Sequence, residues 1–195
     1  MLRRVAFFVF TILRPFIPCK VYGKENVKEN KTLYICNHQS ICDIIVLLAH
    51  LPLNTFFMAK KELFKNKLFG FIFEKVGAFP VDRQSIDLKS IKFACSKINQ
   101  NDNLMIFPQG TRKDAPEIQL EDMHAGVGMI ALKTGATVVP MMFKEKPGFF
   151  KKNVLIIGKP MDLNEFKDKK TNSETLSQFT KKATEELNML LGKIQ

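Results

Sequence analysis

The sequence has no tryptophan, two tyrosines and three histidines among its 195 residues. Its four cysteines form no Cys-x-x-Cys pair, so neither a structural zinc site nor a disulfide framework is supported. No stretch is rich enough in proline, glycine and serine to act as a linker, and no internal repeat is present. We therefore expect one domain with reduced thiols in a protein that faces the cytoplasm.

Acidic residues are also scarce: 19 Asp and Glu stand against 30 Lys and Arg, which gives a net charge of +11. Such a surplus favours a polyanionic partner, which can be a nucleic acid, an anionic membrane surface or a phosphorylated substrate. No basic motif is interleaved with aromatic residues, so we expect no nucleic acid as partner. A non-enzymatic basic protein that binds membranes is the rival interpretation from another class.

Long apolar runs are missing too. The run Val5–Leu13 is about half of the roughly 20 residues that a spanning helix needs. The segment after it offers no small-residue cleavage site for a signal peptide. Because Phe7, Phe8 and Phe10 cover more than one helical face, we expect residues 1–17 to form an interfacial membrane helix, with docking on the protein's own core as the alternative. The predicted location is the cell membrane, with peripheral or monotopic attachment on the cytoplasmic face.

Apolar runs alternate with helical patterns along the rest of the chain. This alternation predicts an α/β fold: a single-domain layered structure over residues 18–195, with a largely parallel or mixed central sheet flanked by helices. A final helix is expected from about Thr171, where Thr171 and Glu174 resemble a capping box. The predicted strands are Leu33–Cys36, Thr55–Ala59, Ala78–Val81, Leu104–Phe107, Val138–Phe143 and Val154–Ile157, and the other predicted helices are Ile41–Ala49, Glu62–Val76, Ile86–Asn99 and Ala125–Thr134.

The densest group of chemically active residues is Asn37–Asp43, directly after the first predicted strand. His38 and Asp43 can form a dyad across a strand-to-helix turn: the carboxylate fixes the imidazole tautomer, and the other ring nitrogen accepts a proton. The same residues also fit an ordinary helix start, in which Ser40 and Asp43 stabilise the first turn. A thioesterase-like nucleophile, Cys42 or Ser40, is a further alternative.

Two more groups follow predicted strands and offer contacts for a phosphate. In the first, Gly110 permits close backbone approach, Thr111 offers a hydroxyl and Arg112 offers a planar guanidinium. The second ends in Arg83. Only five of the 30 basic residues are arginine, and the two outside the N-terminal segment stand at these strand ends, where bidentate phosphate binding suits arginine better than lysine.

Four sequence blocks follow one another at suitable spacing and together carry a family resemblance: NHQSICD, GAFPVDR, FPQGTR and Val138–Met141. From about Tyr34 to Met141 the chain resembles the glycerophospholipid acyltransferase family, and within it the 1-acyl-sn-glycerol-3-phosphate acyltransferases. The resemblance implies that His38 and Asp43 are catalytic. It also implies that the substrate is bound by Arg83, Gln109, Gly110, Thr111 and Arg112. The chain departs from the family pattern at two places: Gln109 replaces a usual Glu, and His124-Ala125 stands where the family often has a Lys before the Gly.

The resemblance also implies a reaction. A fatty acyl group passes from acyl-CoA or acyl carrier protein to the sn-2 hydroxyl of 1-acyl-glycerol-3-phosphate, which gives phosphatidic acid for phospholipid biosynthesis. The acyl donor is a co-substrate, and no bound cofactor or metal is implied. The implied partners are an anionic membrane surface, lysophosphatidate, an acyl thioester and, as one form of donor, acyl carrier protein. Another lysolipid acceptor stays open, as does a non-catalytic membrane-binding pseudoenzyme suggested by Gln109.

Overall fold

The computed structural model describes residue 12, residues 14–82 and residues 87–193. Most of the helix predicted over residues 1–17 lies outside these residues, and so does Arg83. Of the N-terminal segment, a short 3-10 turn at Arg14–Phe16 (η1) is described. None of the helices in the described ranges is both long and apolar enough to cross a bilayer.

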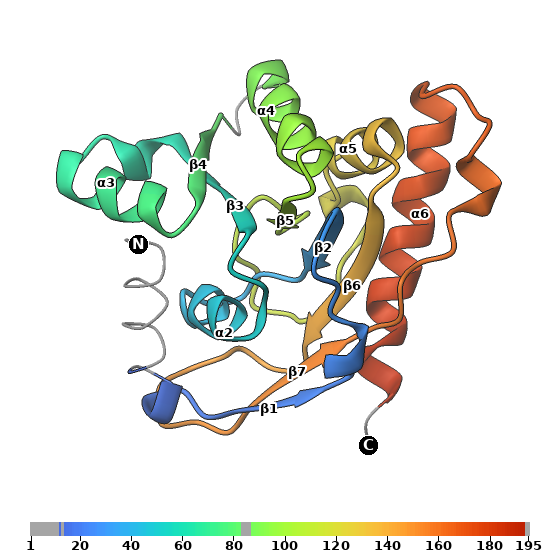
Figure 1. Ribbon diagram of the computed structural model, residues 1–195. Coiled ribbons are helices and arrows are strands. Elements are labelled where there is room, and N and C mark those ends of the chain that lie inside the picture. Colours follow the sequence, from blue (N-terminus) through green and yellow to red (C-terminus); the bar gives the residue numbers. More distant parts are fainter. Residues whose placement is uncertain (1–11, 13, 83–86, 194–195) are drawn as a thin grey trace.

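A seven-stranded sheet forms the centre of the molecule, in the order β1-β7-β6-β2-β5-β3-β4 (Figure 1). The five neighbours from β6 to β4 are parallel, whereas β7 is antiparallel to β6 and β1 is parallel to β7. The largely parallel, mixed sheet confirms the predicted α/β fold. The strands are β1 Cys19–Tyr22, β2 Thr32–Cys36, β3 Thr55–Lys60, β4 Ala78–Val81, β5 Asn103–Ile106, β6 Thr137–Phe143 and β7 Asn153–Ile157.

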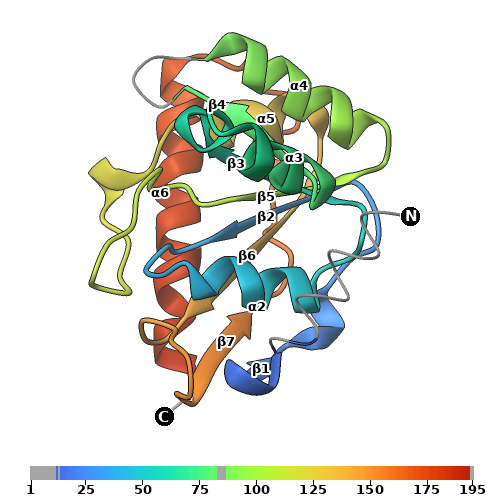
Figure 2. The same cartoon turned by 90° about the vertical axis from the view of Figure 1, so that its left-hand side faces the viewer.

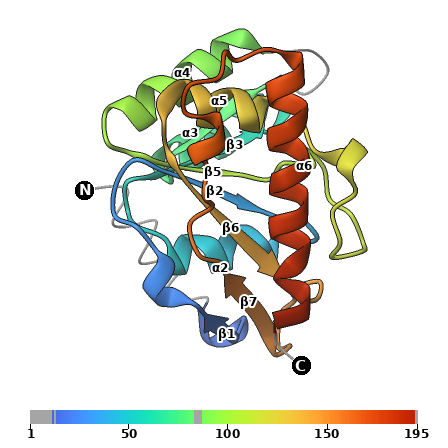
Figure 3. The same ribbon diagram turned by 90° about the vertical axis from the view of Figure 1, so that its right-hand side faces the viewer.

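Helices cover both faces of the sheet and create two apolar cores. Figure 2 shows α2 and α4 on opposite sides of β2, and Figure 3 shows α6 beside β6 on the α4 side. Alternate residues of β2 serve the two cores: Leu33 and Ile35 face α4, α5 and α6, while Tyr34 and Cys36 face α2. The helices are α2 Cys42–His50, α3 Lys67–Lys75, α4 Leu88–Asn99, α5 Gly126–Thr134 and α6 Ser173–Met189.

The direction of the strands decides where chemistry can gather. Strands β2 to β6 all point the same way, so their C-terminal ends meet at one edge, which we call the carboxyl edge. Strands β7 and β1 run the opposite way and begin at this edge. In parallel sheets this edge is the usual place for a binding site, because the loops that follow the strands converge there.

Three details differ from the sequence prediction. Strand β1 was not predicted, because its four residues lie between Pro18 and Gly23 and include a charged lysine. The helix predicted over Glu62–Val76 is broken at Asn66, whose side chain accepts a hydrogen bond from the Leu68 N–H at 3.0 Å. The predicted capping box is wrong: Asn172 caps α6 by accepting from the Thr175 N–H at 2.9 Å.

Candidate active site

The structure brings His38 and Asp43 together at the carboxyl edge. Buried strand β2 ends at Cys36, and α2 begins at Cys42, so both side chains belong to one tight strand-to-helix connection. Nδ1 of His38 lies 2.7 Å from Oδ2 of Asp43, and both residues are buried. The predicted dyad therefore exists as a geometric unit.

Asp43 is arranged to hold a negative charge. Besides the imidazole, its Oδ2 accepts hydrogen bonds from the backbone N–H groups of Gln39 at 2.7 Å and Ser40 at 2.9 Å. Hydrogen bonds to an ionised acceptor are strong, and Asp43 also lies in the first turn of α2, where the helix dipole favours an anion. An ionised Asp43 keeps the proton of His38 on Nδ1, so Nε2 retains its lone pair.

The turn after β5 holds His38 from the other side. The imidazole stacks on Phe107, with ring centroids 4.0 Å apart and planes at 16°. The His38 N–H donates to Oε1 of Gln109 at 3.0 Å, and the His38 carbonyl accepts from the Lys113 N–H at 2.8 Å. Residues 107–113, which contain the FPQGTR block, thus hold the backbone of His38 in the NHQSICD block.

Gln109 has a role that sequence reasoning missed. The residue is 3% exposed, and its Oε1 supports the His38 backbone, while no hydrogen-bond partner for its buried Nε2 is found in the part of the chain that the structure describes. A carboxylate at this position could accept the same hydrogen bond from His38, so the amide preserves this positioning contact. No local pattern signals a contact across 71 positions of sequence.

Asn37 and Gln39 are two further positioning residues that the sequence did not reveal. The buried side chain of Asn37 accepts from the Phe143 N–H at 2.8 Å and donates to the Phe143 carbonyl at 3.0 Å. Nε2 of Gln39 donates to the Asp114 carbonyl at 2.9 Å. These amides hold the residues on both sides of His38 to the end of β6 and to a neighbouring loop. The only signal in the sequence was their place beside the histidine.

Of the predicted phosphate-binding residues, Gly110, Thr111 and Arg112 lie in one segment after β5 that the structure describes, whereas Arg83 does not belong to the described residues. Gly110 adopts φ +65°, a backbone conformation that favours glycine, and a Cβ there would lie 2.6 Å from Nε2 of His124, so a larger residue would also displace that ring. Thr111 and Arg112 follow it and are exposed, on the same segment whose Lys113 N–H binds the His38 carbonyl.

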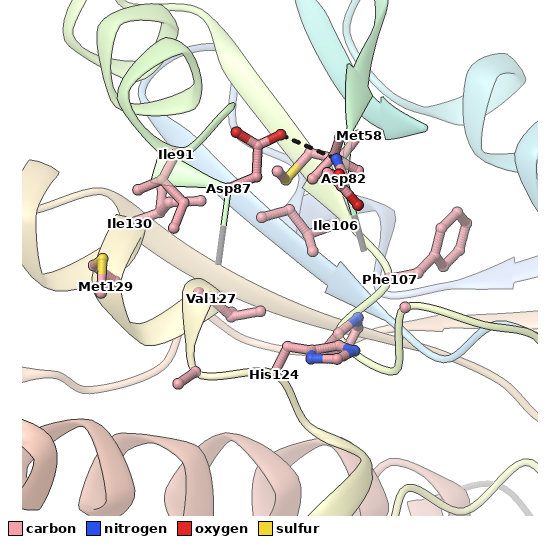
Figure 4. A pocket seen from close by; sticks show the side chains of 15 residues that line it. Met58, Asp82, Asp87, Ile91, Ile106, Phe107, His124, Val127, Met129 and Ile130 are labelled. Carbon is pink, nitrogen blue, oxygen red and sulfur yellow. Dashed lines mark hydrogen bonds between the residues drawn. The ribbon is translucent and has the colours of Figure 1, made fainter. Parts of the chain in front are cut away.

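A mainly apolar cavity of about 460 Å³ lies beside the dyad, and Figure 4 shows the side chains that line it. Phe107 lines it and also stacks on His38, so the two sites share a wall. Figure 4 shows Asp82 and Asp87 at one end and His124 at the other. The apolar side chains between them include Met58, Ile91, Ile106, Val127, Met129 and Ile130.

The alternative nucleophiles are poorly placed for attack on a substrate. Cys42, the first residue of α2, is buried in an apolar core, and Ser40 Oγ accepts a hydrogen bond from the Cys42 N–H at 3.2 Å. Burial, reinforced by nearby Asp43, raises the pKa of the Cys36 thiol well above its ordinary value. Within the described ranges, no three His, Cys, Asp or Glu side chains gather as a metal site requires.

Comparisons with known proteins agree with this geometry. The acyltransferase family matches residues 18–144. The chain is 38% identical over 153 residues to a 1-acyl-sn-glycerol-3-phosphate acyltransferase of Bacillus subtilis, with 75% of each chain covered. It is 32% identical over 120 residues to a Streptococcus pneumoniae protein of the same name, covering 60% of this chain and 43% of that one.

A solved structure extends the likeness to the fold. The crystal structure of the 1-acyl-sn-glycerophosphate acyltransferase from Thermotoga maritima matches with a TM-score of 0.71 at 23% identity, covering 100% of this chain and 80% of that one. The chain belongs to the acyltransferase family. The predicted family, fold class and enzyme class are thereby confirmed.

Proposed function

We propose that this protein transfers a fatty acyl group from an acyl thioester to the sn-2 hydroxyl of 1-acyl-glycerol-3-phosphate and so produces phosphatidic acid. The single observation that carries the proposal is the buried His38–Asp43 pair, with a 2.7 Å hydrogen bond, at the carboxyl edge. The acceptor is supported by relatives that bear the name of this activity, one of them 38% identical.

The residues define one proton path. Nε2 of His38 accepts the proton of the sn-2 hydroxyl while that oxygen attacks the thioester carbonyl. Asp43 holds Nδ1–H and stabilises the imidazolium that forms. When the tetrahedral intermediate collapses, the C–S bond breaks, the new C–O ester bond remains, and the imidazolium returns its proton to the leaving thiolate. No covalent bond to the enzyme is needed.

We assign substrate binding to the residues that the family resemblance indicates. Arg83, Thr111 and Arg112 would hold the acceptor phosphate, with Gly110 allowing its close approach. The apolar cavity beside Phe107 suits a hydrocarbon chain, since its lining offers dispersion contacts and few polar groups. Gln109 would act on the backbone of His38, in addition to the substrate-binding role that the family resemblance implies.

The acyl donor is acyl-CoA or acyl carrier protein, used as a co-substrate without a bound cofactor or metal. We place the protein at the cytoplasmic face of the cell membrane, attached peripherally or monotopically. The net charge of +11 and the Phe-rich segment within residues 1–17 support an anionic membrane surface as the partner, in preference to nucleic acid.

A two-way substrate panel tests the proposal. Purified full-length protein would be given labelled acyl-CoA or acyl carrier protein with lysophosphatidate, lysophosphatidylglycerol or lysophosphatidylcholine as acceptor. We expect labelled phosphatidic acid as the main product with at least one donor. Preferred acylation of another lysolipid would replace the acceptor, and no product with any combination would favour the pseudoenzyme interpretation.

A further inference from the structure

We propose that the loop Lys144–Lys152 between β6 and β7, which we call the aromatic loop, inserts Phe149 and Phe150 into an anionic lipid bilayer. Phe149 is 49% exposed and Phe150 is 81% exposed, the highest value for any large hydrophobic side chain in the described part of the chain. Two adjacent phenylalanines held in water are a costly feature for a soluble surface, and such patches mark contact sites.

The loop is built to display these side chains. Asn153, which is buried, accepts from the Gly148 N–H at 2.9 Å and donates to the carbonyls of Gly148 at 3.1 Å and Lys151 at 2.9 Å. Phe150 adopts φ +56°, a left-handed conformation that bulky residues avoid. The Asn153 side chain thus fixes the turn on both sides of the two phenylalanines, and both stay exposed on the surface.

The charges around the tip point to an anionic lipid. The nine residues of the loop contain four lysines and one glutamate. Lys151 pairs with Glu145 at 3.0 Å and Lys146 with Asp114 at 2.8 Å. The other two lysines of the loop, Lys144 and Lys152, leave a positive excess. At a membrane interface, phenylalanine rings commonly lie at the acyl boundary, and lysine ammonium groups bind the lipid phosphates.

The position of the loop joins it to the active site. The loop starts at the carboxyl edge, where Phe143 exchanges two hydrogen bonds with Asn37, the residue before His38. The Phe150 N–H donates to the Phe16 carbonyl at 2.7 Å, and the rings of Phe16 and Phe150 meet edge to face at 5.8 Å. Figure 1 shows the orange loop reaching the blue η1 turn. Insertion of the loop would therefore bring the edge that carries His38 to the bilayer.

This inference deepens the proposed function, on which it rests for the idea that the substrates lie in a membrane. The experiments below measure binding to lipid vesicles, however, so their results do not depend on whether the protein transfers acyl groups. An acidic protein such as acyl carrier protein is the competing occupant of a basic aromatic loop. The bilayer is favoured because two neighbouring phenylalanines are exposed on one loop that also carries four lysines, a combination that suits an acyl boundary beneath lipid phosphates.

The absence of tryptophan permits a direct test. Phe150→Trp would create the only tryptophan, and Met189→Trp on α6, where Met189 is 52% exposed, provides the matched control. With phosphatidylcholine vesicles that contain phosphatidylglycerol, we expect the tryptophan emission of the Phe150→Trp variant to shift to the blue and to be quenched by brominated lipid. Neither change is expected for the control, nor with pure phosphatidylcholine.

A loss-of-binding variant completes the experiment. Phe149→Ser/Phe150→Ser should bind the anionic vesicles at least roughly tenfold more weakly than Met189→Ser, because two rings lose their apolar contact. Its rate with a water-soluble short-chain acceptor should stay within a few-fold of wild type. Vesicle binding that leaves the tryptophan emission unchanged, absence of vesicle binding, equal binding by the double variant, or an emission shift caused by acyl carrier protein alone would each overturn the proposal.

Discussion

At the scale of single residues, the site depends on backbone amides as much as on the catalytic pair. Two N–H groups fix Asp43, and one carbonyl and one N–H of His38 are held by the turn that contains Gln109. A small displacement of an acid–base group costs rate, so these contacts predict effects of substitutions that leave the imidazole untouched.

Asp43→Asn is expected to lower kcat by about 10²–10⁴-fold, because a neutral amide neither fixes the Nδ1–H tautomer nor stabilises the imidazolium. Circular dichroism should show a folded protein. The control is Asp114→Asn, an exposed carboxylate on a neighbouring loop, which should retain its rate. A folded Asp43→Asn variant with nearly wild-type kcat would mean that Asp43 only starts the helix.

Gln109 permits a second comparison. Gln109→Leu removes the acceptor for the His38 N–H and should reduce kcat roughly tenfold, the usual worth of one buried hydrogen bond. Gln109→Glu keeps an acceptor, so we expect kcat within a few-fold of wild type and a larger change in the KM for the acceptor. A hundredfold higher kcat in Gln109→Glu than in the wild type would show that the natural glutamine impairs catalysis.

At the scale of elements, the sequence correctly predicted the features that neighbouring residues determine, which are six strands and the His38–Asp43 pair. Six strands were found because buried parallel strands are continuous apolar runs, as in β2, whose five residues are all buried. The dyad was found because both members lie within six consecutive residues. The Asn37 clamp on Phe143 and the Gln109 contact to His38 join distant segments, and nothing in their local sequence specifies the partner.

The start of α4 supplies a prediction about pH. Hydrogen bonds from the Asp82 N–H and from Ser90 lower the pKa of Asp87 to about 2, below its value of about 3.9 in an unfolded chain. Ionised Asp87 therefore stabilises the fold above about pH 4, and this contribution is lost as pH falls through about 2. Asp87→Ala should lower the free energy of unfolding by about 1 kcal/mol at pH 7.

Urea unfolding at several pH values checks this assignment. The difference between wild type and Asp87→Ala should shrink as pH falls from 4 toward about 2. Asp168→Ala, which removes an exposed carboxylate, should be close to neutral throughout. A stability difference that is constant across this pH range would show that the charge of Asp87 is not what caps α4.

At the scale of the whole molecule, the carboxyl edge collects the catalytic pair, the turn around Gly110 and the aromatic loop. Strands β2 to β6 end there, and β7 begins there, so residues far apart in the chain meet on one side. We infer that this edge is the side that faces the membrane in the proposed function, and the net charge of +11 suits an anionic surface. Membrane attachment is then expected from two parts, the segment before η1 and the aromatic loop.

Removal of residues 1–13 should lower the membrane-bound fraction and make the remainder sensitive to salt, because lysine attraction is screened at high ionic strength. Adding Phe149→Ser/Phe150→Ser to the shortened protein should release it into the soluble fraction. Sedimentation with anionic vesicles at low and high salt measures both effects. Full, salt-resistant binding of the shortened double variant would place the attachment elsewhere on the surface.

Everything proposed for the active site depends on His38 acting as the base of an acyl transfer. The most direct measurement is the rate of labelled acyl transfer to lysophosphatidate by His38→Ala, with His50→Gln at the far end of α2 as control. We expect a folded His38→Ala protein whose rate is about 10²–10⁴-fold lower, beside a control within a few-fold of wild type. A folded His38→Ala protein that transfers acyl groups at nearly the wild-type rate would contradict this expectation.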